Sequence, residues 1–192
     1  MPITTVAYCK AFRGIEAENT EHDAELDRLI SAVQTWLEGE CGRAFDSAQV
    51  TEYYSGEQWT DRLLIARPPI INIVNLWDDT TWTYSTPLAA AAYAIENADA
   101  GLVIRLDGGQ FAKGRRNIKI TYVGGFATMP ADLEQAAIEL VWAAREKGHS
   151  NLIGVRSRSV GDGNVQFVNL DWGSSNLAPI IDKYRLMTGV AG

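Results

Sequence analysis

The sequence has few histidines and cysteines, the side chains on which most catalytic and metal sites depend. Among 192 residues there are only two of each, His22, His149, Cys9 and Cys41. Neither histidine has a serine, cysteine or carboxylate at a spacing that indicates a catalytic triad, and the four residues lack the close pairing that zinc requires. We therefore predict no catalytic residue, no metal site and no cofactor, and we do not expect an enzyme.

Motifs that bind phosphate or activate a serine are also missing. No G-x-S-x-G occurs. The stretch GGQFAKGRR has glycines, but its lysine precedes Gly114 and Arg115 follows, whereas a Walker A loop needs Gly-Lys-Ser/Thr. The carboxylates of WDD at 77–79 and GDGN at 161–164 lack the ligand spacing of a calcium loop. Ordinary turns explain these stretches.

Long apolar runs are absent. Apolar residues make up 46% of the chain, but no run approaches the roughly 20 residues of a membrane-spanning helix. The first residues, MPITTVAYCKAF, lack the basic start and long apolar centre of a secretory signal, so we expect the protein to be made in a cytoplasm. Cys9 and Cys41 fall at apolar positions of predicted helices, where reduced, buried thiols are expected.

The net charge of −7 is concentrated at one end of the chain. Residues 1–48 hold nine acidic and four basic residues, a net −5, while 49–125 and 126–192 carry −1 each. Tight binding to a phosphate backbone needs concentrated lysine and arginine. The N-terminal third is therefore not expected to bind nucleic acid, and a solvated helix face explains its charge.

Helical and strand patterns alternate along the chain. Apolar spacing predicts helices near 5–12, 20–41, 130–147 and 176–186, with Thr20 and Asp23 as a capping box and Gly42 as the C-terminal stop of the second. Runs rich in β-branched and aromatic residues predict strands between 49 and 125: VTEYY, RLLIA, IINIVNLW, TWTY, YAIE, LVIRL and NIKITYV. A loop or loose hairpin with GDGN at its tip is expected after the third long helix.

The predicted fold class is therefore α+β. Residues 1–48 and 126–192 form an α-helical frame, and an antiparallel β block at about 49–125 is inserted into it, all expected to be one structural unit.

The helix near 130–147 has more apolar surface than one core contact requires. Its seam is Leu133, Ala136, Ala137, Leu140, Val141 and Ala144. Ile138 and Trp142 lie four residues apart on a different face. Two explanations stay open: contact with a neighbouring subunit, or burial under the β block.

The six tryptophans leave a second alternative open. Trp59, Trp77 and Trp82 lie in or beside the β block, where exposed rings stack on sugars, although core packing is the commoner role. Aromatic residues also anchor protein interfaces.

Five segments in this order resemble the head-tail connector, or adaptor, family of tailed bacteriophages. They are VAYCKAFRGIEAENTEHDAELDRLISAVQTWLEGECGRAF, RPPIINIVNL, ITYVGGFATMPADLEQAAIELVWAAREKG, VRSRSVGDGNVQF and LAPIIDKYRL. The resemblance implies a ring of about a dozen copies under the portal, with closed cyclic symmetry and heterologous interfaces. Such a ring extends the DNA channel, offers a docking platform for the stopper or tail, and catalyses nothing.

The resemblance also implies partners, a location and contact residues. The partners are copies of the chain itself, the portal protein, a stopper or tail-completion protein, and genomic DNA that passes without sequence-specific binding. The location is the virion neck, after assembly in the bacterial host cytoplasm. Portal-docking candidates are Leu177, Ile180, Ile181, Tyr184 and Arg185. In such a ring the surplus apolar face makes Ile138 and Trp142 inter-subunit candidates. Arg156 and Arg158 are the other inter-subunit candidates, and two partners stay open for them, a neighbour's carboxylates or DNA. The alternatives are a carbohydrate- or protein-binding β module of a phage tail component, and an enzyme with an unfamiliar site.

Overall fold

The computed structural model describes residues 2–57, 60–106, 108–149, 157–160, 163–166 and 177–186. Its contacts divide the chain into two compact units. The helical unit holds Pro2–Gly42 and Met129–Gly192, and the β unit holds Arg43–Thr128. The described helices and antiparallel strands confirm the α+β prediction, with the strands of the β unit inserted between the second and third helices. That the two units act as one structural unit stays a prediction.

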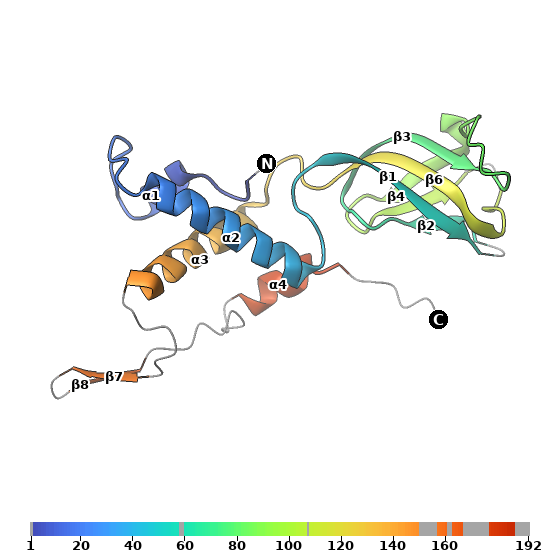
Figure 1. Cartoon of the computed structure of the whole chain (residues 1–192). Helices are drawn as coiled ribbons and strands as arrows, with labels where there is room; N and C mark the ends of the chain where they lie inside the picture. Colours follow the sequence, from blue (N-terminus) through green and yellow to red (C-terminus); the bar gives the residue numbers. More distant parts are fainter. Residues whose placement is uncertain are drawn as a thin grey trace. The chain divides into compact units, whose positions relative to one another are not determined.

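The helical unit is built on two long helices. α2 (Asp23–Cys41) packs against α3 (Ala131–His149), and the short α1 (Val6–Phe12) contacts both (Figure 1). None of the described helices combines the length and apolar composition that a membrane span requires. One stripe of α2 at helical spacing is buried: Leu26, Ile30, Val33, Leu37 and Cys41.

The two ends of α2 test the predicted caps. Gly42 ends the helix at φ 66°, the left-handed conformation that glycine adopts without strain, as predicted. The predicted capping box is wrong, because α2 begins at Asp23 with His22 at the N-cap and no side-chain capping bond. The backbone N–H of Asp23 donates to the carbonyl of Thr20 (3.2 Å), which makes residues 20–23 a turn before the helix.

The thiols and one lysine are buried in the helical unit. Cys9 and Cys41 form no disulfide and are fully buried, as predicted. Burial, together with the charge of Glu134, raises the pKa of the Cys9 thiol to about 11, so this thiol stays protonated and unreactive near neutral pH. The ammonium group of Lys10 lies 2.5 Å from a carboxylate oxygen of Asp23 and ties α1 to the start of α2.

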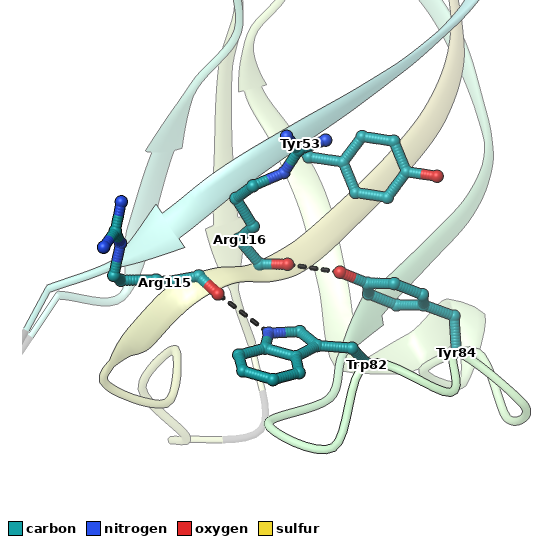
Figure 2. A pocket seen from close by; sticks show the side chains of 5 residues that line it. All are labelled: Tyr53, Trp82, Tyr84, Arg115 and Arg116. Carbon is teal, nitrogen blue, oxygen red and sulfur yellow. Dashed lines mark hydrogen bonds between the residues drawn. The ribbon is translucent and has the colours of Figure 1, made fainter.

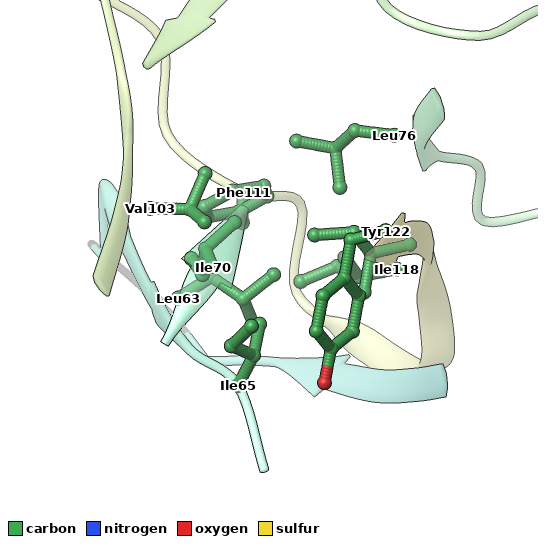
Figure 3. Close-up of a cluster of buried hydrophobic side chains, with 9 residues drawn as sticks. Leu63, Ile65, Ile70, Leu76, Val103, Phe111, Ile118 and Tyr122 are labelled. Atoms are coloured by element: carbon green, nitrogen blue, oxygen red, sulfur yellow. The ribbon is translucent and has the colours of Figure 1, made fainter. Parts of the chain in front are cut away.

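The β unit consists of two antiparallel sheets. One has the strand order β1 (Ala48–Gly56), β6 (Gly114–Gly124), β3 (Ile70–Asp78), and the other the order β2 (Arg62–Leu64), β5 (Leu102–Arg105), β4 (Tyr93–Asn97). A cluster of buried side chains, drawn in Figure 3, forms the core of this unit: Leu63, Ile65, Ile70, Leu76, Val103, Phe111, Ile118, Ile120 and Tyr122. The single turn η1 (Ala90–Ala92) precedes β4.

One predicted strand does not form. TWTY at 81–84 lies in the connection after β3. The carboxylate of Asp79 binds backbone N–H groups that would otherwise be available to pair with a neighbouring strand. It accepts hydrogen bonds from the backbone N–H groups of Thr81 and Tyr84 and from the hydroxyls of Thr81 and Thr83, at 2.6–2.8 Å. These bonds also hold the pKa of Asp79 far below its usual range.

The C-terminal part contains a hairpin and a helix. β7 (Ser157–Val160) pairs antiparallel with β8 (Gly163–Gln166), so of the two expected forms, loop or loose hairpin, the strands form the hairpin. α4 (Ala178–Tyr184) contacts α2 and α3. The backbone N–H of Leu186 donates to the carbonyl of Cys41 (2.7 Å), so the end of α4 is joined to the end of α2.

Candidate functional site

The second apolar face of α3 is covered by the protein itself. Ile138 and Trp142 are only 6% and 5% exposed. The indole N–H of Trp142 donates to the carbonyl of Cys9 in α1 (3.0 Å), and the guanidinium groups of Arg13 and Arg145 each lie 5.2 Å from the centre of its rings. These two side chains are therefore not exposed for a neighbouring subunit, and that expectation is corrected: both are buried within the chain itself, and Trp142 contacts α1.

Apolar surface is exposed instead on α1. Tyr8 and Phe12, four residues apart, are 57% and 46% exposed. They are the large apolar side chains of the helical unit that lie open to solvent among the described residues. The sequence carries a signal for them, an aromatic pair at i and i+4 on one face of the helix. Our sequence reasoning missed it.

α4 uses most of the predicted portal-docking residues to attach itself to the helical unit. Leu177, Ile181 and Tyr184 are buried. Ile180 is half-buried and Arg185 is exposed, with one guanidinium nitrogen 3.6 Å from Asp182. The expectation that all five face a partner is therefore corrected, because a helix this short needs tertiary packing for its stability. Only Ile180 and Arg185 leave side-chain surface for a partner.

A polar clamp fixes the end of α4. The carboxylate of Asp132, in the first turn of α3, accepts from the ammonium group of Lys183 (2.6 Å) and from the hydroxyl of Tyr184 (2.6 Å). The bond from Lys183, followed by that from Tyr184, lowers the pKa of Asp132 below its ordinary value of 3.8. The clamp therefore stabilises the fold above this ordinary value and is lost as the pH falls through the lowered one.

Asp132→Asn tests the clamp. Because the group is partly exposed, we expect a loss of about 0.5–1 kcal/mol in the free energy of unfolding at pH 7, shrinking towards zero as the pH falls below about 4. Urea unfolding at pH 7 and pH 3 measures this, with Asp182→Asn as the exposed control. A difference that is the same at both pH values would contradict the role of the carboxylate.

The remaining inter-subunit candidates have no described side chain. Arg156 lies outside the described residues. Arg158 is in β7, opposite Val165 of β8. Their role stays a prediction.

An open hollow lies at one end of the β unit, where rings and guanidinium groups gather (Figure 2). It is lined by Tyr53, Trp82, Tyr84, Arg115 and Arg116. The indole N–H of Trp82 donates to the carbonyl of Arg115 (2.8 Å), and the hydroxyl of Tyr84 donates to the carbonyl of Arg116. Both rings thus turn their polar atoms to the backbone of β6.

The backbone of this hollow is unusual. Trp82, Tyr84 and Arg116 have φ values of 60°, 46° and 51°, a left-handed region that residues other than glycine seldom adopt. They are the non-glycine residues with positive φ among those described. Such strain persists where surrounding bonds over-determine the conformation, and here the Asp79 network and the two bonds to β6 provide that support.

The tryptophans considered for sugar stacking differ in how far their rings are exposed. Trp82 is 62% exposed. One face of Trp77 is occupied, because the ammonium group of Lys119 lies 4.5 Å from its ring centre. Trp59 lies outside the described residues. A stacking platform at this end would therefore rest on Trp82.

The candidates for catalysis and metal binding do not converge. His22 lies at the start of α2, 3.8 Å from Glu25, and His149 is the last residue of α3. Among the described residues, no group of three or more His, Cys, Asp or Glu side chains is arranged to hold a metal ion. The hollow of the β unit has aromatic and basic groups but neither histidine.

A family model described as head completion protein matches residues 2–187. No curated protein matches. Among solved structures, a chain in "Neck of empty GTA particle computed with C6 symmetry" has a TM-score of 0.60 at 18% identity, covering 100% of this chain and 92% of that one. A chain in "Neck of native GTA particle computed with C12 symmetry" gives 0.58 at 18%, covering 97% and 91%. One in "Virion of native gene transfer agent (GTA) particle" gives 0.59 at 20%, covering 100% and 92%.

Proposed function

Because the chain belongs to the head completion protein family, we propose that it is a structural protein of the neck of a phage-like virion. About a dozen copies form a closed ring under the portal, and the ring extends the DNA channel and receives the stopper or tail. The protein is assembled in the bacterial host cytoplasm and acts without catalysing a reaction. The observation that carries this proposal is the family match, which includes both the helical unit and the β unit.

A ring places a definite demand on the surface of each subunit. In a cyclic ring every copy offers two different faces, each complementary to the other. Since Ile138 and Trp142 are buried, we assign Tyr8 and Phe12 on the outer side of α1 to one of these faces. Their exposed rings are the apolar anchors that such an interface uses.

The acidic end of the chain suits a DNA channel. Residues 1–48 carry a net charge of −5, and Asp27 and Glu40 of α2 are exposed. A channel lined by basic groups would hold phosphates, whereas acidic groups repel them and let DNA slide without sequence-specific binding. We propose that part of this acidic surface faces the channel.

The C-terminal segment docks on the portal in this proposal. Leu177, Ile181 and Tyr184 seat α4, and Ile180 and Arg185 are left for the partner. Removing all of 176–192 would therefore expose the core beneath α4, so point substitutions make the better test.

Portal co-purification of the full chain tests the docking. We expect the wild type to co-purify with the portal protein encoded with it, and Ile180→Asp/Arg185→Glu to lose at least tenfold of the bound protein. The control is Ser31→Asp/Arg28→Glu, which makes the same change of charge at exposed positions of α2 and should bind normally. Equal binding by both variants would contradict docking through α4. No binding by the wild type would contradict the proposed function.

A further inference from the structure

The outer face of the sheet β1-β6-β3 carries alternating cations and aromatic rings near its Arg116 end. Lys119 is opposite Tyr53 on β1 and opposite Trp77 on β3. Its ammonium group lies 4.5 Å from the ring centre of Trp77 and 5.4 Å from that of Tyr84. The guanidinium of Arg116 lies 5.0 Å from the ring of Tyr53. We call this surface the cation–aromatic face: Tyr53, Trp77, Trp82, Tyr84, Arg116 and Lys119.

The rings of this face are held in place before any partner arrives. Trp82 and Tyr84 use their polar atoms on the carbonyls of β6 (Figure 2), and Tyr53 meets Tyr84 edge to face at 5.6 Å. Even so, Trp82 is 62% and Tyr53 41% exposed. Fixed, exposed tryptophan, tyrosine and arginine side chains are the residues that dominate binding energy at protein interfaces, and their rigidity lowers the entropy lost on binding.

The charge of this face identifies the chemistry of its partner. The segment KGRRNIK contains Lys113, Arg115, Arg116 and Lys119 and no acid. Within the described ranges, none of these four side chains forms an ion pair with a carboxylate. Asp79, whose carboxylate accepts from the backbone N–H of Tyr84, already takes four hydrogen bonds. The complement is a segment with several exposed carboxylates.

The chain itself contains such a segment. The acidic loop, residues 16–21 between α1 and α2, has the sequence EAENTE with Glu16, Glu18 and Glu21 exposed. No ion pair of these three is recorded in the part of the chain that the structure describes. The loop belongs to the helical unit and the cation–aromatic face to the β unit. Two different, complementary surfaces on one chain are what a ring interface requires.

We propose that the cation–aromatic face of one copy binds the acidic loop of the next copy in the ring. This inference rests on the proposed function and adds a second contact to the one at α1. The rings supply buried area, and the charges select the partner and the orientation. Because exposed charges are screened within about 8 Å at physiological salt, assembly through this contact weakens as salt is raised.

Cysteine cross-linking tests the contact directly. The native thiols are fully buried, so Glu18→Cys/Arg115→Cys places the reactive thiols only at the loop and beside the face, where Arg115 lines the same hollow as Trp82 and Arg116. On oxidation of the chain bound to portal rings, we expect a ladder of covalent oligomers on a denaturing gel. The control pair is Arg28→Cys/Arg115→Cys, whose first thiol lies at an exposed position of α2. This pair should give no covalent oligomers. Cross-links within single chains only, or no cross-links, would overturn the inference.

Mixing two variants gives an independent test. Trp82→Asn/Arg116→Asp removes the face with residues that tolerate positive φ, and Glu16→Lys/Glu18→Lys/Glu21→Lys removes the loop. Each alone should form at least tenfold fewer rings in electron micrographs. An equal mixture keeps one intact contact, so we expect heterodimers of twice the monomer mass and no restored rings.

Normal rings from either variant would overturn the inference and leave the proposed function standing, whereas a wild type without rings would overturn both. Glycan binding that Trp82→Asn abolishes, with no ladder in the cross-linking test, would assign the face to a carbohydrate instead.

Discussion

Gly125→Ala is expected to destabilise the β unit by about 3 kcal/mol or more. Gly125 has φ 105°, and a Cβ at this position would lie 2.1 Å from the carbonyl oxygen of Asp46 and 2.9 Å from the Cα of Ser47. Both are backbone atoms, so no change of side-chain rotamer relieves the contact. The backbone N–H of Gly125 also donates to the carbonyl of Pro69 (3.0 Å), and this bond opposes any shift of the chain.

A second glycine of the same unit separates the two causes. Gly108 has φ 70° with nothing within 4 Å of its Cβ position. Gly108→Ala therefore carries only the cost of the left-handed conformation, about 1 kcal/mol. Urea unfolding should give a much lower midpoint for Gly125→Ala than for Gly108→Ala. Equal midpoints would show that the close approach to Asp46 and Ser47 is not present.

Trp142→Ala is expected to cost the helical unit about 3–5 kcal/mol. The substitution leaves a cavity between α3 and α1 and takes away the donor that satisfies the carbonyl of Cys9. Trp142→Phe keeps most of the apolar contact and loses the hydrogen bond, so we expect a smaller loss of about 1–2 kcal/mol. Tyr8→Ala, at an exposed position of α1, should stay within about 0.5 kcal/mol of the wild type.

This series also distinguishes burial from subunit contact. Thermal or urea unfolding of the isolated chain should rank the variants Trp142→Ala, Trp142→Phe, Tyr8→Ala, from least to most stable. Ring formation with the portal should be lost in Tyr8→Ala/Phe12→Ala although that variant folds normally. If Trp142→Ala were as stable as the wild type and failed only in assembly, Trp142 would belong to the subunit interface after all.

The long helices could be predicted from the sequence because their determinants are local. The apolar spacing of α2 and the glycine after it, and the proline and acids before and within the first turn of α3, are all readable within about 20 residues. What covers an apolar face is not local. Trp142 meets α1 through an atom of Cys9, 133 residues away in the sequence. Periodicity therefore predicted correctly that α3 has a second apolar face. It did not predict that α1 of the same chain contacts Trp142 on this face.

The connection after β3 shows how one side chain can override composition. Thr, Trp, Thr and Tyr are typical strand residues, and their pattern favours a strand at 81–84. Asp79 accepts hydrogen bonds from the local backbone N–H and hydroxyl groups. Such side-chain bonds to the backbone compete with the hydrogen bonds between strands. The aspartate before the pattern was the available signal.

The cation–aromatic face was not predicted because it is assembled from separate segments. Tyr53, Trp82 and Arg116 come from β1, from the connection after β3 and from β6, and their proximity depends on strand register. β1 and β3 both have irregularities in their pairing with β6, which periodicity cannot reveal. The cations of KGRRNIK were readable, but their turn-like glycine and asparagine favoured the interpretation as a solvated turn.

We propose that this chain forms a ring at the neck of a virion. Cryo-EM of the full chain bound to its portal is the decisive measurement. It should show a closed ring of about a dozen copies in which each Trp142 is covered by α1 of its own copy and α4 points its Ile180 and Arg185 side to the portal. A portal with no ring of this chain, or a ring in which Trp142 packs against a neighbouring copy, would contradict it.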